Sequence, residues 1–114
     1  ILGVCLGMQG MAQYYGADLK QYYVSHGKKS KIKVDTDSIL FKNTNEYLEV
    51  GLYHSWHVEQ LNEKIFTPIS IDEKGVLMAI ESLKLSLFGV QFHPESIMTP
   101  SGRIIINNFL NYKR

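Results

Sequence analysis

The chain has 114 residues, of which 45% are hydrophobic and 20% charged, and its formal net charge is +1. This length allows one domain at most, the composition excludes wholesale disorder, and the near-neutral charge gives no electrostatic footprint for nucleic acid or an anionic membrane. The one cysteine excludes an internal disulfide framework, and no apolar run approaches the ~18–20 residues of a membrane span, so we expect a soluble protein of the reducing cytoplasm.

The chain opens with an apolar stretch at residues 1–4, which is typical of a strand buried on both faces. Because a buried strand rarely begins a protein, we expect an N-terminally truncated fragment, the C-terminal part of a single domain whose first strands are missing. Residues 6–15 predict a helix, since Met8, Ala12 and Tyr15 recur at the spacing of one buried face. Gly16 suits the left-handed residue that ends such a helix.

The middle of the chain alternates β-forming runs with turn-forming residues. Asp-Glu-Lys-Gly at residues 72–75 is a good hairpin loop between two such runs, and the basic stretch at residues 26–31 is predicted as a loop. The predicted strands are residues 19–24, 47–53, 66–71, 76–82 and 87–92, with short apolar pieces at residues 32–34 and 39–41.

The last predicted element is a helix that Thr99 can cap, with Pro100 at its first position. Apolar residues between 105 and 110 supply its buried face, and the basic residues 113–114 suit the negative end of the helix dipole. The strand–turn–helix start, together with the strands that follow, predicts an α/β fold.

The first candidate site is Gly-Val-Cys-Leu-Gly at residues 3–7, where a buried strand runs into a helix. This is the pattern of a nucleophile elbow, in which side chains at Gly3 or Gly7 would collide with the opposite limb of the turn. The thiol of Cys5 then lies at a helix N-terminus, which favours the thiolate, and the amide of Leu6 faces the position of a tetrahedral oxyanion. Alternatively, Cys5 is a buried structural cysteine.

The second candidate site is Gly-Val-Gln-Phe-His-Pro-Glu at residues 89–95, where a strand carries His93 to its carboxyl end. Ligands of open α/β sheets bind at the carboxyl ends of strands, so His93 and Cys5 are expected to meet there. His93 would take the thiol proton, and Glu95 would orient the imidazole and stabilise its charged form. The alternative is a surface histidine beside a surface glutamate.

Together, residues 3–9 and 89–95 resemble the class I glutamine amidotransferases. The resemblance implies an open, mostly parallel sheet with flanking helices and a flavodoxin-like core. It also implies a triad in which Cys5 is the nucleophile, His93 the general base and Glu95 its orienting partner. L-glutamine would be converted to a γ-glutamyl thioester and ammonia, and water would then release glutamate.

Other segments are similar to one branch of that family, the small subunits of anthranilate synthase and aminodeoxychorismate synthase. These segments are Ser-His-Gly-Lys at residues 25–28 and Tyr-His-Ser at residues 53–55. The resemblance implies that Gln9, Ser55 and the backbone of Trp56 contact glutamine. The partner that it implies is a larger chorismate-binding subunit, with residues 25–31 as candidates for the interface, and it implies neither a metal nor an organic cofactor.

The chain also departs from this family. Met8 stands where many relatives have histidine, and Trp56-His57 replaces the more usual Leu-Val. We expect His57 to be a solvated strand residue, and we assign no acid–base role to His26 or His54. The family's upstream glycine-rich loop, whose amide completes the oxyanion hole, has no counterpart before Ile1, and such a donor contributes about 2.7–4 kcal/mol. Residues 1–114 by themselves are therefore not expected to be fully active.

Two further hypotheses remain open. The triad is equally compatible with the amidotransferase domain of another synthetase, such as those that make GMP, CTP or carbamoyl phosphate. The other hypothesis is a non-catalytic regulatory domain of the same fold, although such domains usually lose the nucleophile or the base. A cysteine peptidase or γ-glutamyl hydrolase of a related fold fits the Gln9 and Ser55 segments less well. The sequence does not distinguish anthranilate from aminodeoxychorismate as the product.

Overall fold

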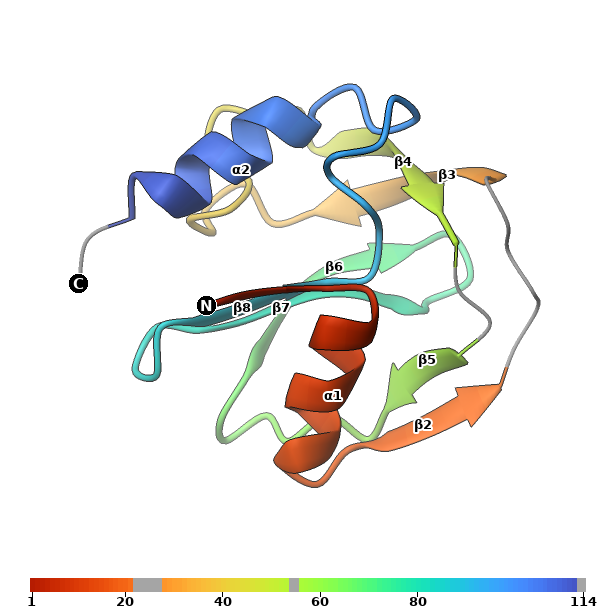
Figure 1. Ribbon diagram of the computed structural model, residues 1–114, viewed down its shortest axis with the longest axis vertical. Helices are drawn as coiled ribbons and strands as arrows, with labels where there is room; N and C mark the ends of the chain where they lie inside the picture. The colour runs from red at the N-terminus through yellow and green to blue at the C-terminus, as the bar shows by residue number, and fades with distance from the viewer. Residues whose placement is uncertain (22–27, 54–55, 113–114) are drawn as a thin grey trace.

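The computed structural model describes residues 1–21, 28–53 and 56–112. Two helices and eight strands make up this part of the chain (Figure 1). In chain order they are β1 (Leu2–Val4), α1 (Leu6–Tyr14), β2 (Asp18–Gln21), β3 (Lys28–Val34), β4 (Tyr47–Leu52), β5 (Trp56–Glu59), β6 (Thr67–Asp72), β7 (Leu77–Ser82), β8 (Leu87–Val90) and α2 (Gly102–Leu110).

The strands form a curled six-stranded sheet in the order β1-β8-β7-β6-β3-β4 and a small second sheet of β2 and β5. The α/β class is therefore confirmed. The sheet is mixed rather than mostly parallel, because β1 and β8 are the one parallel pair among the described strands. Short connections account for this, since a parallel pair needs a long crossover, whereas the turns after β6 and β7 lead directly back along the sheet.

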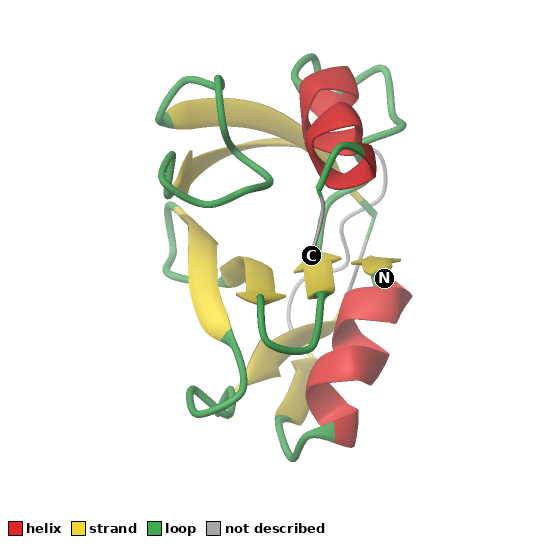
Figure 2. Cartoon of the chain, turned by 90° about the vertical axis from the view of Figure 1, so that its left-hand side faces the viewer, coloured by secondary structure: helices red, strands yellow, loops and turns green. Residues whose placement is uncertain are grey.

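The two helices lie on opposite sides of the β1–β8 pair (Figures 1 and 2). Successive side chains of a strand point to opposite faces, and β8 contacts both layers in this way. Phe88 and Val90 belong to the core that includes Ile105 of α2. Between them, a Cβ on Gly89 would lie 2.9 Å from the side chain of Met8 in α1. Both faces of β8 are thus buried.

The predicted first helix is confirmed. Met8 and Ala12 of α1 are fully buried, and Gly16 follows the helix with a φ of +97°, in the left-handed region. The prediction of a loop over residues 26–31 is wrong for residues 28–31, which belong to β3. Lysines at 29, 31 and 33 face solvent while Ile32 and Val34 are buried, an alternation that holds the strand in place.

The start of α2 also differs from its prediction. The helix begins at Gly102, with Ser101 preceding it, and the side chain of Thr99 makes no capping hydrogen bond. Ile105 is buried as expected, but Leu110 is 69% exposed. Residues 113–114 lie outside the described chain. Neither helix in residues 1–21, 28–53 and 56–112 combines the length and apolar character needed to cross a membrane.

Candidate active site

Cys5 occupies a strained turn between β1 and α1. Its φ is +53°, an uncommon value for a residue with a side chain, and its amide donates a 2.8 Å hydrogen bond to the carbonyl of Val90. A Cβ on Gly3 would lie 2.7 Å from the backbone carbon of Gly7, so the expected collision at Gly3 is confirmed. The same expectation for Gly7 is wrong, because a Cβ there would meet open space.

The parallel pairing of β1 and β8 brings the two candidate motifs to one edge of the sheet. Val4 lies opposite Val90 in the register, so Cys5 and the residues after Val90 leave the sheet side by side. Cys5 and His93 both line one cavity of about 340 Å³. Its other lining residues are Val4, Leu6, Gln9, Tyr53 and Trp56.

The imidazole of His93 is held from two sides. Its Nδ1 lies 2.8 Å from Oε2 of Glu95, as the sequence predicted. The ring of Tyr53 packs against it edge to face, with centroids 5.1 Å apart and an interplanar angle of 88°. Since Nδ1 is engaged by Glu95, Nε2 is the ring nitrogen left for chemistry.

The loop that carries His93 and Glu95 is tied to the neighbouring elements by Thr99. Its hydroxyl donates to the carbonyl of His93 at 2.8 Å and accepts the amide of Gly51, at the end of β4, at 2.9 Å. These bonds explain why Thr99 does not cap α2. At the end of this loop, Gly102 packs directly against the backbone of Pro94. Only glycine allows this approach, because a Cβ at residue 102 would overlap the carbonyl oxygen of Pro94.

Burial raises the pKa of the Cys5 thiol above its ordinary value. The backbone amide of Leu6 and the side chain of Gln91 lower that pKa by smaller amounts, and the charge of Glu95 raises it. The net direction is opposite to the one predicted from the helix N-terminus, because that prediction left out the loss of solvent around the sulfur. Burial therefore disfavours ionisation of the Cys5 thiol.

The predicted substrate contacts are only partly described. Gln9 is 3% exposed, and its Nε2 donates to the carbonyl of Trp56 at 2.8 Å and to Oε1 of Gln91 at 3.1 Å. The Trp56 carbonyl thus already accepts a hydrogen bond from the protein, and the Trp56 side chain lines the cavity. Ser55 and His54 lie outside the described residues, as does His26.

Sequence reasoning assigned no role to Gln91 or Tyr53. Gln91 is fully buried, and its Nε2 lies 3.6 Å from the Cys5 sulfur as a hydrogen-bond donor. The available signal was a polar residue inside the buried run of residues 87–92, since buried amides require hydrogen-bond partners. Tyr53 belongs to the Tyr-His-Ser segment that resembles the family, but its contact with His93 could not be inferred, because that contact depends on the folding together of distant segments.

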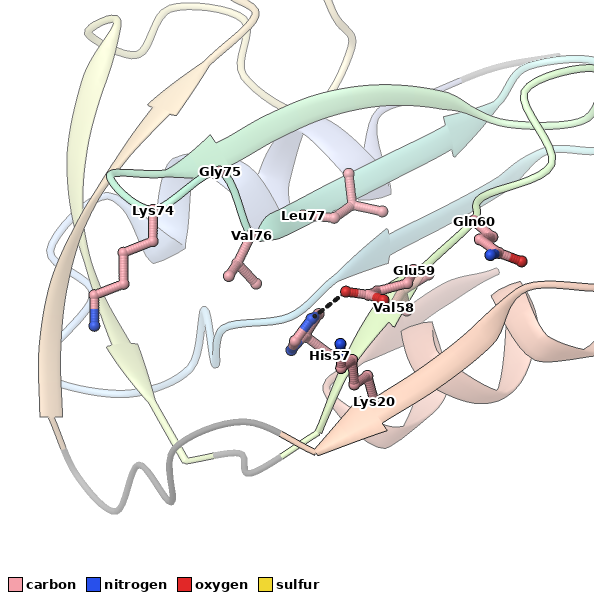
Figure 3. A pocket seen from close by; sticks show the side chains of 9 residues that line it. All are labelled: Lys20, His57, Val58, Glu59, Gln60, Lys74, Gly75, Val76 and Leu77. Atoms are coloured by element: carbon pink, nitrogen blue, oxygen red, sulfur yellow. Dashed lines mark hydrogen bonds and ion pairs between the residues drawn. The ribbon is translucent and has the colours of Figure 1, made fainter.

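A second cavity, of about 560 Å³, contains another histidine (Figure 3). His57 is 7% exposed and its Nε2 lies 3.1 Å from Oε2 of Glu59, with Lys20 and Lys74 also lining the cavity. The expectation that His57 is solvated is wrong, because β5 pairs with β2 and packs near β7. His57 lines this cavity rather than the one that Cys5 and His93 share.

Comparison with known proteins supplies the family. The model for "Glutamine amidotransferase class-I" matches residues 1–112. The aminodeoxychorismate/anthranilate synthase component 2 of Bacillus subtilis is 40% identical over 116 residues, which cover 100% of this chain and 59% of that protein. The glutamine-hydrolyzing GMP synthase of Acetivibrio thermocellus is 37% identical over 110 residues, which cover 96% of this chain and 21% of that protein.

A solved structure agrees with these matches. A protein from Thermoplasma acidophilum, described as a candidate GMP synthase subunit, superimposes with a TM-score of 0.88 at 26% identity, covering 96% of this chain and 55% of that one. The chain thus spans little more than half the length of both the Bacillus relative and this structure. The family model, the identity to curated relatives and the shared fold lead to one conclusion: the chain belongs to the class I glutamine amidotransferase family.

Proposed function

We propose that the chain carries the glutaminase site of an amidotransferase subunit that hydrolyses L-glutamine and passes ammonia to a chorismate-using synthase. One observation carries the proposal: Cys5 and His93 line the same cavity, and His93 is held through Nδ1 by Glu95. A nucleophile, a base and an orienting carboxylate are the three parts that acyl transfer of this type needs.

In the first half-reaction, Nε2 of His93 takes the thiol proton of Cys5 as the sulfur attacks the side-chain amide carbon of glutamine. The Sγ–C bond forms, and the amide of Leu6 donates to the oxygen that gains negative charge. His93 then returns the proton to the leaving nitrogen, so the C–N bond breaks and ammonia departs. Because burial raises the pKa of the Cys5 thiol, this transfer depends on the base.

In the second half-reaction, water attacks the γ-glutamyl thioester. His93 accepts a proton from the water, the hydroxide adds to the carbonyl carbon, and the C–S bond breaks. The sulfur regains its proton from His93, and glutamate leaves. Glu95 stabilises the imidazolium in both halves. Gln9, Ser55 and the Trp56 backbone are the proposed contacts for the substrate.

The partner follows from the chemistry of the product. Ammonia is protonated in water and then no longer acts as a nucleophile, so a docked synthase must receive it directly. The Bacillus relative is a component 2 of aminodeoxychorismate/anthranilate synthase, and we propose a larger chorismate-binding subunit here, with residues 25–31 at the interface. The products would serve tryptophan or folate synthesis, and the unpaired Cys5 suits the reducing cytoplasm.

Labelling with a diazo-ketone analogue of glutamine tests the site in the full-length protein. The proposal expects covalent modification of Cys5, found by mass spectrometry on its peptide, and loss of ammonia release in Cys5→Ser. Gln13→Met, at an exposed position of α1, is the control that keeps activity. An unmodified Cys5, together with ammonia release that survives Cys5→Ser, contradicts the proposal.

The second candidate function is the amidotransferase part of a GMP synthase, which the 37% identity to the Acetivibrio enzyme favours. Both candidates share the glutaminase half-reaction, so the acceptor decides between them. The purified protein is mixed with a chorismate-using large subunit or with a GMP synthetase subunit, and glutamine-dependent product is measured. Amination of chorismate alone supports the first candidate, and amination of the nucleotide alone supports the second.

A further inference from the structure

We infer that Gln91 is a positioning residue for the nucleophile, and that it forms with Gln9 a buried chain of two amides that presents an N–H donor to the sulfur of Cys5. The inference rests on the proposed function, in which Cys5 is the nucleophile. It concerns a residue at the end of β8 that lies behind the cavity wall, because Gln91 is fully buried and is not among the described residues that line the cavity.

The orientation of both amides follows from one fixed acceptor. The carbonyl of Trp56 can only accept a hydrogen bond, so the group 2.8 Å from it must be the NH₂ of Gln9. The second N–H of that NH₂ group points to Gln91 at 3.1 Å, which makes the facing atom of Gln91 its oxygen. Gln91 must then turn its own NH₂ toward Cys5, 3.6 Å from the sulfur.

The direction of this chain has a chemical consequence. A donor that faces a sulfur stabilises its negative charge, so Gln91 favours the thiolate over the thiol. A flipped amide would present its oxygen and disfavour the thiolate. Burial raises the pKa of Cys5, and the donors from Leu6 and Gln91 oppose that rise. Gln91 therefore offsets part of the rise in the pKa of Cys5 that burial causes.

Titratable groups also lie around the sulfur. His93 and Tyr53 are the titratable side chains that share its cavity, and Glu95 lies close enough for its charge to raise the pKa of the thiol. Gln91 carries no charge and does not titrate, so its contribution is constant across the working pH range. Removing it should move the ionisation of Cys5 without adding a new titrating group.

The test replaces Gln91 by methionine, which keeps the length of the side chain and removes its donor. Alkylation of Cys5 by iodoacetamide is followed against pH on the Cys5 peptide by mass spectrometry, and ammonia release gives kcat and KM. We expect the alkylation midpoint to move to higher pH and kcat to fall roughly 2- to 10-fold, the loss of one hydrogen bond. KM should change little, because Gln91 does not line the cavity.

Gln13→Met, on the exposed face of α1, is the matched control and should move neither quantity. If Gln91→Met fails to fold, Gln9→Met breaks the same chain from its other end, and its alkylation midpoint should also move to higher pH. A folded Gln91→Met, or in its place Gln9→Met, with an unchanged midpoint overturns the inference. The proposed function fails separately, if Cys5→Ser still releases ammonia.

Discussion

Residues 1–21, 28–53 and 56–112 contain two His–Glu pairs with the same spacing in sequence, and these pairs lie in different cavities. His93 lies 2.8 Å from Glu95 and shares its cavity with Cys5. His57 lies 3.1 Å from Glu59, and the cavity it lines contains Lys20 and Lys74 (Figure 3). Sequence spacing alone makes the two pairs equivalent, whereas the fold gives them different neighbours.

The two histidines also differ in the ring nitrogen that faces the carboxylate. His93 uses Nδ1 and His57 uses Nε2. In a triad, the carboxylate binds one nitrogen and the other nitrogen faces the nucleophile. What distinguishes the proposed catalytic pair is thus a third residue, Cys5, at the end of a neighbouring parallel strand. A His–Glu pair by itself says little about catalysis.

The largest expected effect comes from removing the two histidines in turn. His93→Asn should lower kcat for ammonia release by on the order of 10²–10⁴-fold, the contribution of a positioned general base. His57→Asn should keep most of the turnover of the folded protein, because His57 lines the other cavity. Steady-state assays on both variants measure this. Equal losses in the two variants would remove the functional distinction between the pairs.

The next effect concerns the loop that positions the first pair. Gly102→Ala would push a methyl group into the Pro94 carbonyl, so we expect a loss of about 3 kcal/mol or more of unfolding free energy, beyond the usual cost of overpacking. Gly10→Ala is the matched helical control. It meets open space and should stabilise the protein by about 0.5–1 kcal/mol. Urea denaturation of both compares them, and a Gly102→Ala as stable as Gly10→Ala contradicts the packing described for the loop.

A smaller effect is expected at Thr99. Thr99→Val keeps the shape but removes the hydroxyl that joins the carbonyl of His93 to the amide of Gly51, which should cost about 1–3 kcal/mol of stability. The loop would also hold His93 less firmly, so kcat should fall more than KM rises. Thr99→Ser retains the hydroxyl and serves as the control. Activity in Thr99→Val that matches Thr99→Ser would show that His93 is positioned without this bond.

The parts of the fold and site that were predictable from sequence depend on short-range patterns. The elbow around Cys5 required only an apolar strand, a helix and flanking glycines, and the contact at Gly3 agrees with it. The meeting of Cys5 and His93 in one cavity followed from a general rule, that ligands gather where strands of such sheets end.

The parts that were not predictable depend on distant partners. The local sequence predicts Thr99 as a helix cap, yet its hydroxyl accepts a hydrogen bond from the amide of Gly51, which lies 48 residues away in sequence. The antiparallel pairing of most of the sheet and the burial of His57 arise from which strands become neighbours. Burial also reversed the expected direction of the Cys5 pKa, because a sequence shows the helix terminus but not the depth of the sulfur.

The smallest expected effect separates the two glutamates by their influence on that sulfur. The charge of Glu95 raises the pKa of the Cys5 thiol, so Glu95→Gln should shift the alkylation of Cys5 to lower pH while turnover falls. Glu59→Gln, in the other pair, should leave the alkylation profile unchanged, because Glu59 lines the other cavity and does not shift the pKa of this thiol.

Linkage gives a second measurement with a definite sign. The folded-state pKa of Cys5 is raised, so the native state holds this proton more tightly than the unfolded chain does. Its contribution to stability is present below the unfolded pKa and is lost as pH rises through the folded pKa. Glu95→Gln should therefore weaken the alkaline decline in unfolding free energy, whereas Glu59→Gln should preserve it. A decline of equal size in both variants would mean that Glu95 does not act on the thiol.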